Sequence, residues 1–192
     1  MVQSRGLGDV YKRQYLKSRV SETLGLLYAD HFPYRQVETA RNVRQSPIHD
    51  RLKGEGACFG EVSGWERANW FLPKAERDAG KPAEYEYSWK RQNWFDHSAD
   101  EHNAVRNHVG MFDLSSFGKI RVVGKDAEAV LQRLCGNDVA VPDGKIVYTQ
   151  FLNEDGHIEA DVTVTRLSSD EFLVVTPAAT VRRDLHWING HI

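Results

Sequence analysis

This sequence contains few cysteines, and its acidic and basic residues are nearly equal in number. Cys58 and Cys135 are the only two cysteines in 192 residues, and neither belongs to a CxxC motif. This usage suits a reducing compartment and gives no structural zinc site. The 27 acidic and 25 basic residues leave a net charge of −2 without a basic block, which makes nucleic acid an unfavourable partner.

Long apolar runs are also missing. The longest is far too short to cross a bilayer, so we expect no membrane partner. An apolar fraction of 41% in 192 residues fits a soluble globular chain with one domain or two small ones.

The clearest pattern lies between Lys145 and Leu167 and predicts a β-hairpin. Ile146–Leu152 alternates in polarity and is rich in β-branched and aromatic residues. Asn153–Gly156 reads NEDG, a turn composition with glycine where a positive φ is needed. His157–Leu167 alternates again, so a slip of one residue would turn every side chain to the other face.

Asp161 is the unusual residue of this hairpin. A carboxylate is uncommon in mid-strand, and this one stands between Ala160 and Val162. Taken alone, it indicates a strand with one solvated face. Tyr148 on the preceding strand could lie near it, which favours a functional interpretation. The alternation gives the second strand an apolar face (Ile158, Ala160, Val162, Val164) and a polar one (Glu159, Asp161, Thr163, Thr165).

Strands dominate residues 119–176, with helices between and after them. This order predicts an α+β domain with a largely antiparallel sheet. The expected helices are Val20–Ala29, Asp100–Val109, Asp126–Leu134 and Thr180–His191, and the further expected strands are Lys119–Val123 and Phe172–Thr176.

Two other groups of residues are candidate binding sites. Arg41 and Arg44 are three residues apart and could hold one anionic partner, although solvated arginines are the simpler interpretation. His97, His102 and His108 have spacings of five and six, which do not place them on one helical face. We therefore expect solvated histidines and no metal site.

The segment YTQFLNEDGHIEADVTVTRL resembles the tetrahydrofolate-binding aminomethyltransferase domain, the fold of the glycine-cleavage T-protein. It resembles in particular the version fused to flavin-dependent dimethylglycine and sarcosine dehydrogenases. In that family the aspartate of this strand contacts the folate where the one-carbon unit is transferred. The resemblance implies that Asp161 is the catalytic residue and that Tyr148 lines the folate pocket. The T-protein has two acids here, whereas this chain has Ala160-Asp161, as the fused versions tend to.

A second block carries the resemblance independently. Gly54–Pro73 reads GEGACFGEVSGWERANWFLP and is similar to the end of the central region of those dehydrogenases, with the signature SPLHxxL…GAxFGE…GWERPNWF. Ile48 and Ala68 replace the usual leucine and proline. Val109–Gly124 resembles the run that opens the T-protein domain.

The resemblance implies an internal fragment of a larger enzyme. We expect residues 1–14 to be a non-native or disordered leader, 15–73 to end a flavin-oxidoreductase central domain, 74–84 to be a linker, and 85–192 to begin the folate domain. The cofactors would be tetrahydrofolate and, in the parent enzyme, FAD. Gly6-Leu7-Gly8 is a lone GxG that follows no strand, so no dinucleotide fingerprint is present and the fragment alone should not oxidise amines.

Three functions compete at this stage. In the first, the parent oxidises an N-methyl amino acid and this region captures the one-carbon unit as methylene-tetrahydrofolate, in the cytoplasm or, in a eukaryote, in the mitochondrial matrix. In the second, the chain is a non-catalytic folate-binding or assembly module, against which the GWERANWF block speaks. In the third, it is a structural fragment whose activity needs the missing flavin domain and the remainder of the folate domain.

Overall fold

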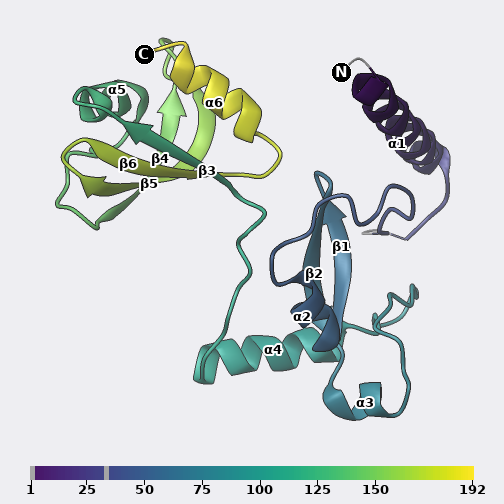
Figure 1. The fold of residues 1–192 in the computed structure, drawn as a ribbon. Coiled ribbons are helices and arrows are strands. Elements are labelled where there is room, and N and C mark those ends of the chain that lie inside the picture. The colour runs from purple at the N-terminus through teal and green to yellow at the C-terminus, as the bar shows by residue number, and fades with distance from the viewer. Residues whose placement is uncertain (1–2, 33–34) are drawn as a thin grey trace. The chain divides into compact units, whose positions relative to one another are not determined.

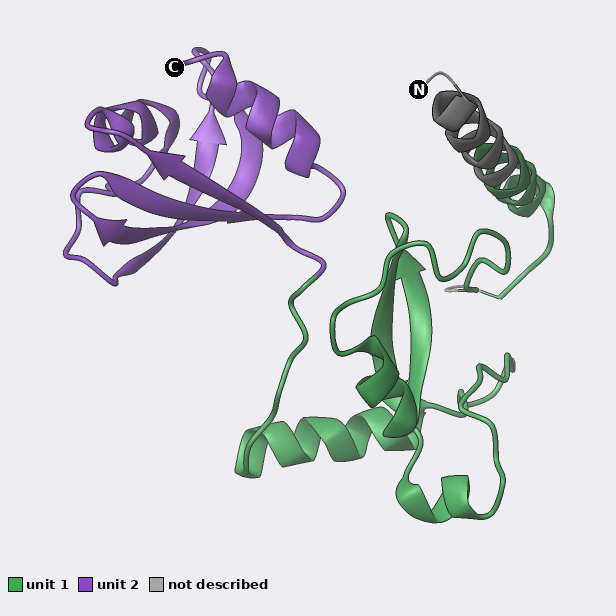
Figure 2. Ribbon diagram, viewed as in Figure 1, with its two compact units in different colours: residues 1–115 green, residues 116–192 purple. Residues whose placement is uncertain are grey.

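The computed structural model describes the backbone of residues 3–32 and 35–192, and the side chains of residues 16–32 and 35–192. The chain forms two compact units (Figure 2). Unit 1 is Met1–Ser115 and unit 2 is Ser116–Ile192. The boundary expected at residues 74–84 stays a prediction, and in the structure this stretch begins with the short helix α3, Lys74–Asp78.

Unit 1 is built around a two-stranded antiparallel hairpin. Its elements are α1 (Gln3–Tyr28), α2 (His49–Gly54), β1 (Ala57–Val62), β2 (Trp65–Phe71), α3 and α4 (Phe95–Asn107) (Figure 1). The turn between the strands places Ser63 and Gly64 at φ 53° and 84°, a conformation that glycine adopts without a steric penalty. A small core of Cys58, Trp70 and Leu72 packs against Ala83, Tyr85 and Trp94.

Two helices of unit 1 begin earlier than the sequence pattern indicates. The helix expected from Val20 begins at Gln3 and therefore includes most of the expected leader, whose side chains lie outside the described residues. α4 begins at Phe95 rather than Asp100. Farther along α1, Arg19 contacts Glu61 of β1 at 2.6 Å and donates to the Thr39 carbonyl at 2.6 Å.

A buried ion pair links the loop before α2 to β2. The Glu66 carboxylate accepts hydrogen bonds from Arg41 Nε at 2.9 Å and Arg41 Nη2 at 2.5 Å. It also accepts one from the Asn42 backbone N–H at 2.6 Å. Arg44 lies 6.0 Å from the ring centroid of Trp65 instead. The interpretation of Arg41 as a solvated arginine is therefore wrong, because its guanidinium forms an ion pair with Glu66.

Unit 2 is an α+β domain with one antiparallel sheet, as predicted. Its elements are β3 (Gly118–Val123), α5 (Ala127–Leu134), β4 (Ile146–Leu152), β5 (Ile158–Ser168), β6 (Glu171–Thr176) and α6 (Val181–Asn189), and the strand order is β3-β6-β5-β4 (Figure 1).

The core of unit 2 lies between the sheet and its two helices. Alternate residues of every strand point to this core, so β5 buries Ala160, Val162 and Val164. Leu131 of α5 and Ile188 of α6 complete the layer. Both helices lie over this one face (Figure 1), and the opposite face of the sheet carries the side chains of intermediate or high exposure.

Candidate functional site

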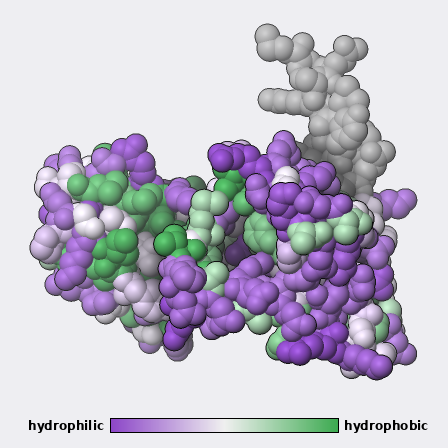
Figure 3. Space-filling view, turned by 90° about the horizontal axis from the view of Figure 1, so that it is seen from below, coloured by the Kyte–Doolittle hydropathy of each residue, from purple (hydrophilic) through white to green (hydrophobic). Residues whose placement is uncertain are grey.

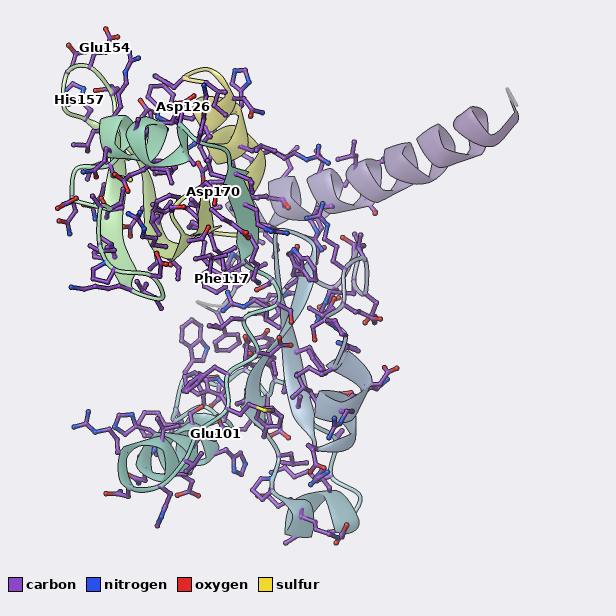
Figure 4. All side chains as sticks on the ribbon, turned by 60° about the vertical axis from the view of Figure 1, so that its left-hand side comes forward. Glu101, Phe117, Asp126, Glu154, His157 and Asp170 are labelled. Carbon is purple, nitrogen blue, oxygen red and sulfur yellow. The ribbon has the colours of Figure 1, made fainter. Side chains whose placement is uncertain are left out.

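The β4–β5 hairpin positions the candidate site. Its turn is locally specified because Asn153 Oδ1 accepts from the Asp155 amide at 3.1 Å and from the His157 amide at 2.9 Å. Gly156 adopts φ 79°. Glu154 and His157 mark the tip of this hairpin in Figure 4. The predicted hairpin, turn and alternation are confirmed.

Asp161 lies on the face of the sheet opposite the helices, and its side chain is exposed. Its partner across the ladder is Gln150, whose Nε2 donates to Asp161 Oδ1 at 3.1 Å. Tyr148 stands opposite Thr163 and is therefore a diagonal neighbour of Asp161, within reach of a long side chain. The structure thus brings together the two residues that the sequence singled out, and adds Gln150.

The neighbouring Asp161 changes the pKa of the Tyr148 phenol. A hydrogen bond with the Asp161 carboxylate, helped by partial desolvation, raises the pKa of Tyr148. A phenol that hydrogen-bonds to a carboxylate stays protonated, because ionisation would place two negative charges side by side. The Tyr148 hydroxyl therefore remains a hydrogen-bond donor next to the Asp161 side chain.

Asn137 supports β4 from the loop that follows α5. Its amide nitrogen Nδ2 donates to the Tyr148 carbonyl at 3.2 Å, and its backbone N–H donates to Thr149 Oγ1 at 3.0 Å. Neither Asn137 nor Gln150 was among the site residues predicted from the sequence. The register of the hairpin could have identified Gln150, because it places Gln150 opposite Asp161. Nothing in the sequence around Asn137 indicates its contacts with β4.

Apolar side chains lie on the same face beside Thr163 and Thr165, where the ladder pairs place Val175 opposite Thr163, and Ile146 and Leu173 opposite Thr165. Ile146 is 63% exposed and Tyr148 is 62% exposed, while Leu173 and Val175 on β6 are half-buried. Figure 3, seen from below the view of Figure 1, shows hydrophobic residues gathered on the surface of unit 2 among hydrophilic ones. A carboxylate acceptor, an amide and a phenol, with apolar side chains farther along the same face, suit a planar ligand that carries N–H groups.

Replacing Asp161 by Asn should lower the pKa of the Tyr148 phenol. The neutral amide removes the adjacent charge that opposes ionisation. Ultraviolet difference titration of the wild-type chain, the Asp161→Asn variant and a Tyr148→Phe reference would isolate this phenol among the seven tyrosines. Identical titration curves for the wild type and Asp161→Asn would show that the two groups do not interact.

The histidines expected to be solvated behave differently from one another. His102 and His108 are exposed, but the side chain of His97 is only 12% exposed and its ring stacks on Trp70 at 5.5 Å. His97 is therefore a packed residue, and that expectation was wrong for it. Within the described part of the chain, no three His, Cys, Asp or Glu residues gather as a metal-ligand set. None of the described helices combines the length and apolarity needed to cross a membrane.

Comparison with known families assigns nearly all of the chain. Residues 48–192 match the GCVT N-terminal domain, and residues 8–46 match the FAD dependent oxidoreductase central domain. The glycine cleavage system aminomethyltransferase T from Bartonella henselae superposes with a TM-score of 0.61 at 23% identity, over 78% of this chain and 36% of that one. This likeness supports the T-protein fold.

Three curated relatives cover most of this chain. The 4-methylaminobutanoate oxidase (formaldehyde-forming) of Paenarthrobacter nicotinovorans is 51% identical over 92% of it. The mitochondrial pyruvate dehydrogenase phosphatase regulatory subunit of Mus musculus is 34% identical over 94%, and the mitochondrial sarcosine dehydrogenase of Homo sapiens is 32% identical over 81%. The chain spans only 21%, 20% and 19% of these relatives, respectively. By its family match over residues 48–192, the chain belongs to the GCVT N-terminal domain family.

Proposed function

We propose that this chain is the folate-binding region of a flavin-dependent N-methyl amino-acid oxidoreductase, where it captures a one-carbon unit as methylene-tetrahydrofolate. Asp161 carries the proposal. It is an exposed mid-strand carboxylate on the sheet face opposite the helices, with Gln150 and Tyr148 against it. Acidic residues are uncommon in mid-strand, and this exposed one has no ion-pair partner among the described residues that would give it a structural role, which favours a binding role.

The chemistry asks for a fixed negative charge beside the reacting nitrogen. FAD, when bound in the parent protein, supplies the oxidation of the N-methyl amine to an iminium. Asp161 would stabilise that cation while a folate nitrogen attacks its carbon, and would accept the proton that this N–H gives up. A second folate nitrogen would then bond to the same carbon and pass its proton to the demethylated amine, which would leave as its own C–N bond breaks. Gln150 would hold the carboxylate in position through its 3.1 Å hydrogen bond. The exposed Tyr148 ring would offer a stacking surface for the folate pterin.

The remaining parts of the machinery would lie outside this chain. By parent protein we mean the longer protein of which this chain would be part. We propose that its other segments hold FAD, bind the N-methyl amino acid and complete the folate domain. If the source is eukaryotic, the mitochondrial names of the sarcosine dehydrogenase and regulatory-subunit relatives favour the mitochondrial matrix.

A second candidate is a non-catalytic folate-binding or assembly module. One observation favours it specifically: a relative that is 34% identical over 94% of the chain is named as a regulatory subunit. The same fold would then bind its ligand without transferring a one-carbon unit.

Product analysis separates the two candidates. The purified parent protein would oxidise an N-methyl amino acid while tetrahydrofolate is increased, and free formaldehyde and methylene-tetrahydrofolate would be measured. We expect formaldehyde to fall as methylene-tetrahydrofolate rises, with total oxidised amine unchanged. A formaldehyde yield that does not respond to tetrahydrofolate would overturn the proposal, whereas folate binding without any amine oxidation would favour the module.

A further inference from the structure

Unit 1 contains a cavity of about 540 Å³ that the candidate site in unit 2 does not use. Four aromatic side chains form much of its wall: Trp70, Tyr85, Tyr87 and Trp94. We call these four residues the aromatic cage. The other described residues that line the cavity are Gln36, Asn69, Gln92 and Ser98, so no described lining residue carries a formal charge.

The rings of the aromatic cage meet at two kinds of angle. Trp70 and Tyr85 are nearly perpendicular, at 81° with centroids 6.2 Å apart, whereas Tyr85 and Tyr87 are parallel within 5° at 5.9 Å. Trp70 is 1% exposed and therefore backs the cavity, whereas Tyr85, Tyr87 and Trp94 are half-buried and present the more accessible ring surfaces. Tyr85 and Tyr87 stack directly on each other and leave no slot between them for a flat ring, so a compact group on the outer ring surfaces fits this arrangement better.

Hydrogen bonds and burial hold the aromatic cage in place. The Tyr85 hydroxyl accepts from Asn69 Nδ2 at 2.8 Å, and the Tyr87 hydroxyl accepts from the Gln36 backbone N–H at 2.8 Å. Trp70 is almost completely buried in the core of unit 1. A preformed cavity needs little ordering when a ligand enters, so weak contacts can produce measurable binding.

The charge pattern indicates which ligand the aromatic cage would prefer. The face of an aromatic ring is the negative side of its quadrupole and attracts a cation, best of all at tryptophan. An anion would find neither lysine nor arginine among the described lining residues. Methylated ammonium groups combine a positive charge with an apolar surface, which is the chemistry that aromatic cages recognise.

We propose that the aromatic cage binds the methylated ammonium group of a small amine, at a site separate from Asp161. The proposal rests on the proposed function only in that the parent protein would handle N-methyl amino acids. Its chemical basis is the set of ring faces and the absence of lysine and arginine from the described lining.

The test uses the 192-residue chain and two matched probes. Trimethylglycine and 3,3-dimethylbutanoate have the same shape and the same carboxylate, but only trimethylglycine carries the ammonium charge. Binding would be followed by calorimetry and by the NMR signals of the tryptophan indole groups. We expect trimethylglycine to bind saturably and its isostere to bind about tenfold more weakly or worse. Equal affinities, or no saturable binding of trimethylglycine, would overturn the proposal.

Variants locate the binding. Trp94→Leu should weaken trimethylglycine binding by about tenfold, because it removes one ring face. Trp89→Leu is the matched control, since Trp89 is 84% exposed and is not among the lining residues. Circular dichroism would confirm that both variants fold, and Tyr87→Leu would replace Trp94→Leu if that variant does not. An equal effect of Trp89→Leu and the cage variant would contradict the proposed location.

The same experiment distinguishes this inference from the proposed function. Asp161→Asn should leave trimethylglycine binding unchanged, because Asp161 does not line the cavity. If the aromatic cage binds the probe but the parent protein forms no methylene-tetrahydrofolate, only the proposed function fails. If methylene-tetrahydrofolate forms but the probe does not bind, only the present inference fails.

Discussion

Replacing Phe151 by Ala should lower the free energy of unfolding of unit 2 by about 3–5 kcal/mol. Phe151 is fully buried on β4, in the core between the sheet and the helices, and pairs with Cys135 across an isolated bridge. Removing its ring both loses apolar burial and leaves a cavity. Because domains are typically stable by only about 5–15 kcal/mol, this change should bring unit 2 close to unfolding.

Ile146→Ala on the same strand is the matched control for this prediction. Ile146 is 63% exposed on the opposite face, so its replacement should change the stability by about 0.5 kcal/mol or less. Hydrogen exchange, measured by mass spectrometry on peptides from residues 116–192 at increasing denaturant, reports on unit 2 alone. Similar losses for the two variants would contradict the assignment of Phe151 to the core.

Glu66→Gln should destabilise unit 1 by about 3 kcal/mol, at the lower end of the usual range for a broken buried pair. The Glu66 side chain is 1% exposed, and its loss of charge would leave the Arg41 guanidinium without its carboxylate. We expect a loss at the lower end of this range because 25% of the Arg41 side chain is exposed, so water can partly solvate the unpaired guanidinium. Adding Arg41→Met should recover part of the loss, and additive effects in the double-mutant cycle would show that the pair is not coupled.

Acid should have the same effect on the wild type as this substitution. Burial alone would raise the pKa of Glu66, but the hydrogen bonds from Arg41 and the Asn42 amide outweigh it, so the pKa is lowered from 4.5. Because the pKa of Glu66 is lower in the folded than in the unfolded state, its ionised carboxylate stabilises the folded state at pH values above the unfolded-state pKa. This stabilisation is lost as the pH falls through the folded-state pKa. Unit 1 should therefore lose stability below about pH 4.5, and Glu66→Gln should lose this component of its pH dependence.

The hairpin that carries the candidate site was predictable because its signals are local. Alternation over Ile146–Leu152 and the NEDG turn act between near neighbours, and tertiary packing did not change them. Asp161 and Tyr148 stood out in the strand pattern and received their roles from the resemblance, and the register explains why their side chains meet. Gln150 follows from that same register, although the sequence pattern alone gave no reason to single it out.

Other features depend on partners distant in the sequence. Arg41 was interpreted as solvated because its spacing from Arg44 says nothing about Glu66, which follows it by 25 positions. His97 was misjudged for the same reason, since the Trp70 ring that covers it lies on β2. Long-range pairs of this kind leave no periodic signal in a single sequence, so they became visible only in the structure.

The central claim is that Asp161 acts in one-carbon capture and not in amine oxidation. Asp161→Asn in the parent protein should leave folding and amine oxidation nearly unchanged, because the substitution is on an exposed side chain. The ratio of methylene-tetrahydrofolate to free formaldehyde, at saturating tetrahydrofolate, should fall about tenfold or more, because a fixed charge at the reacting group is lost. Glu159→Gln removes an acid from the same strand and face and should keep the wild-type ratio. An unchanged ratio in Asp161→Asn, or a loss of amine oxidation itself, would contradict the account.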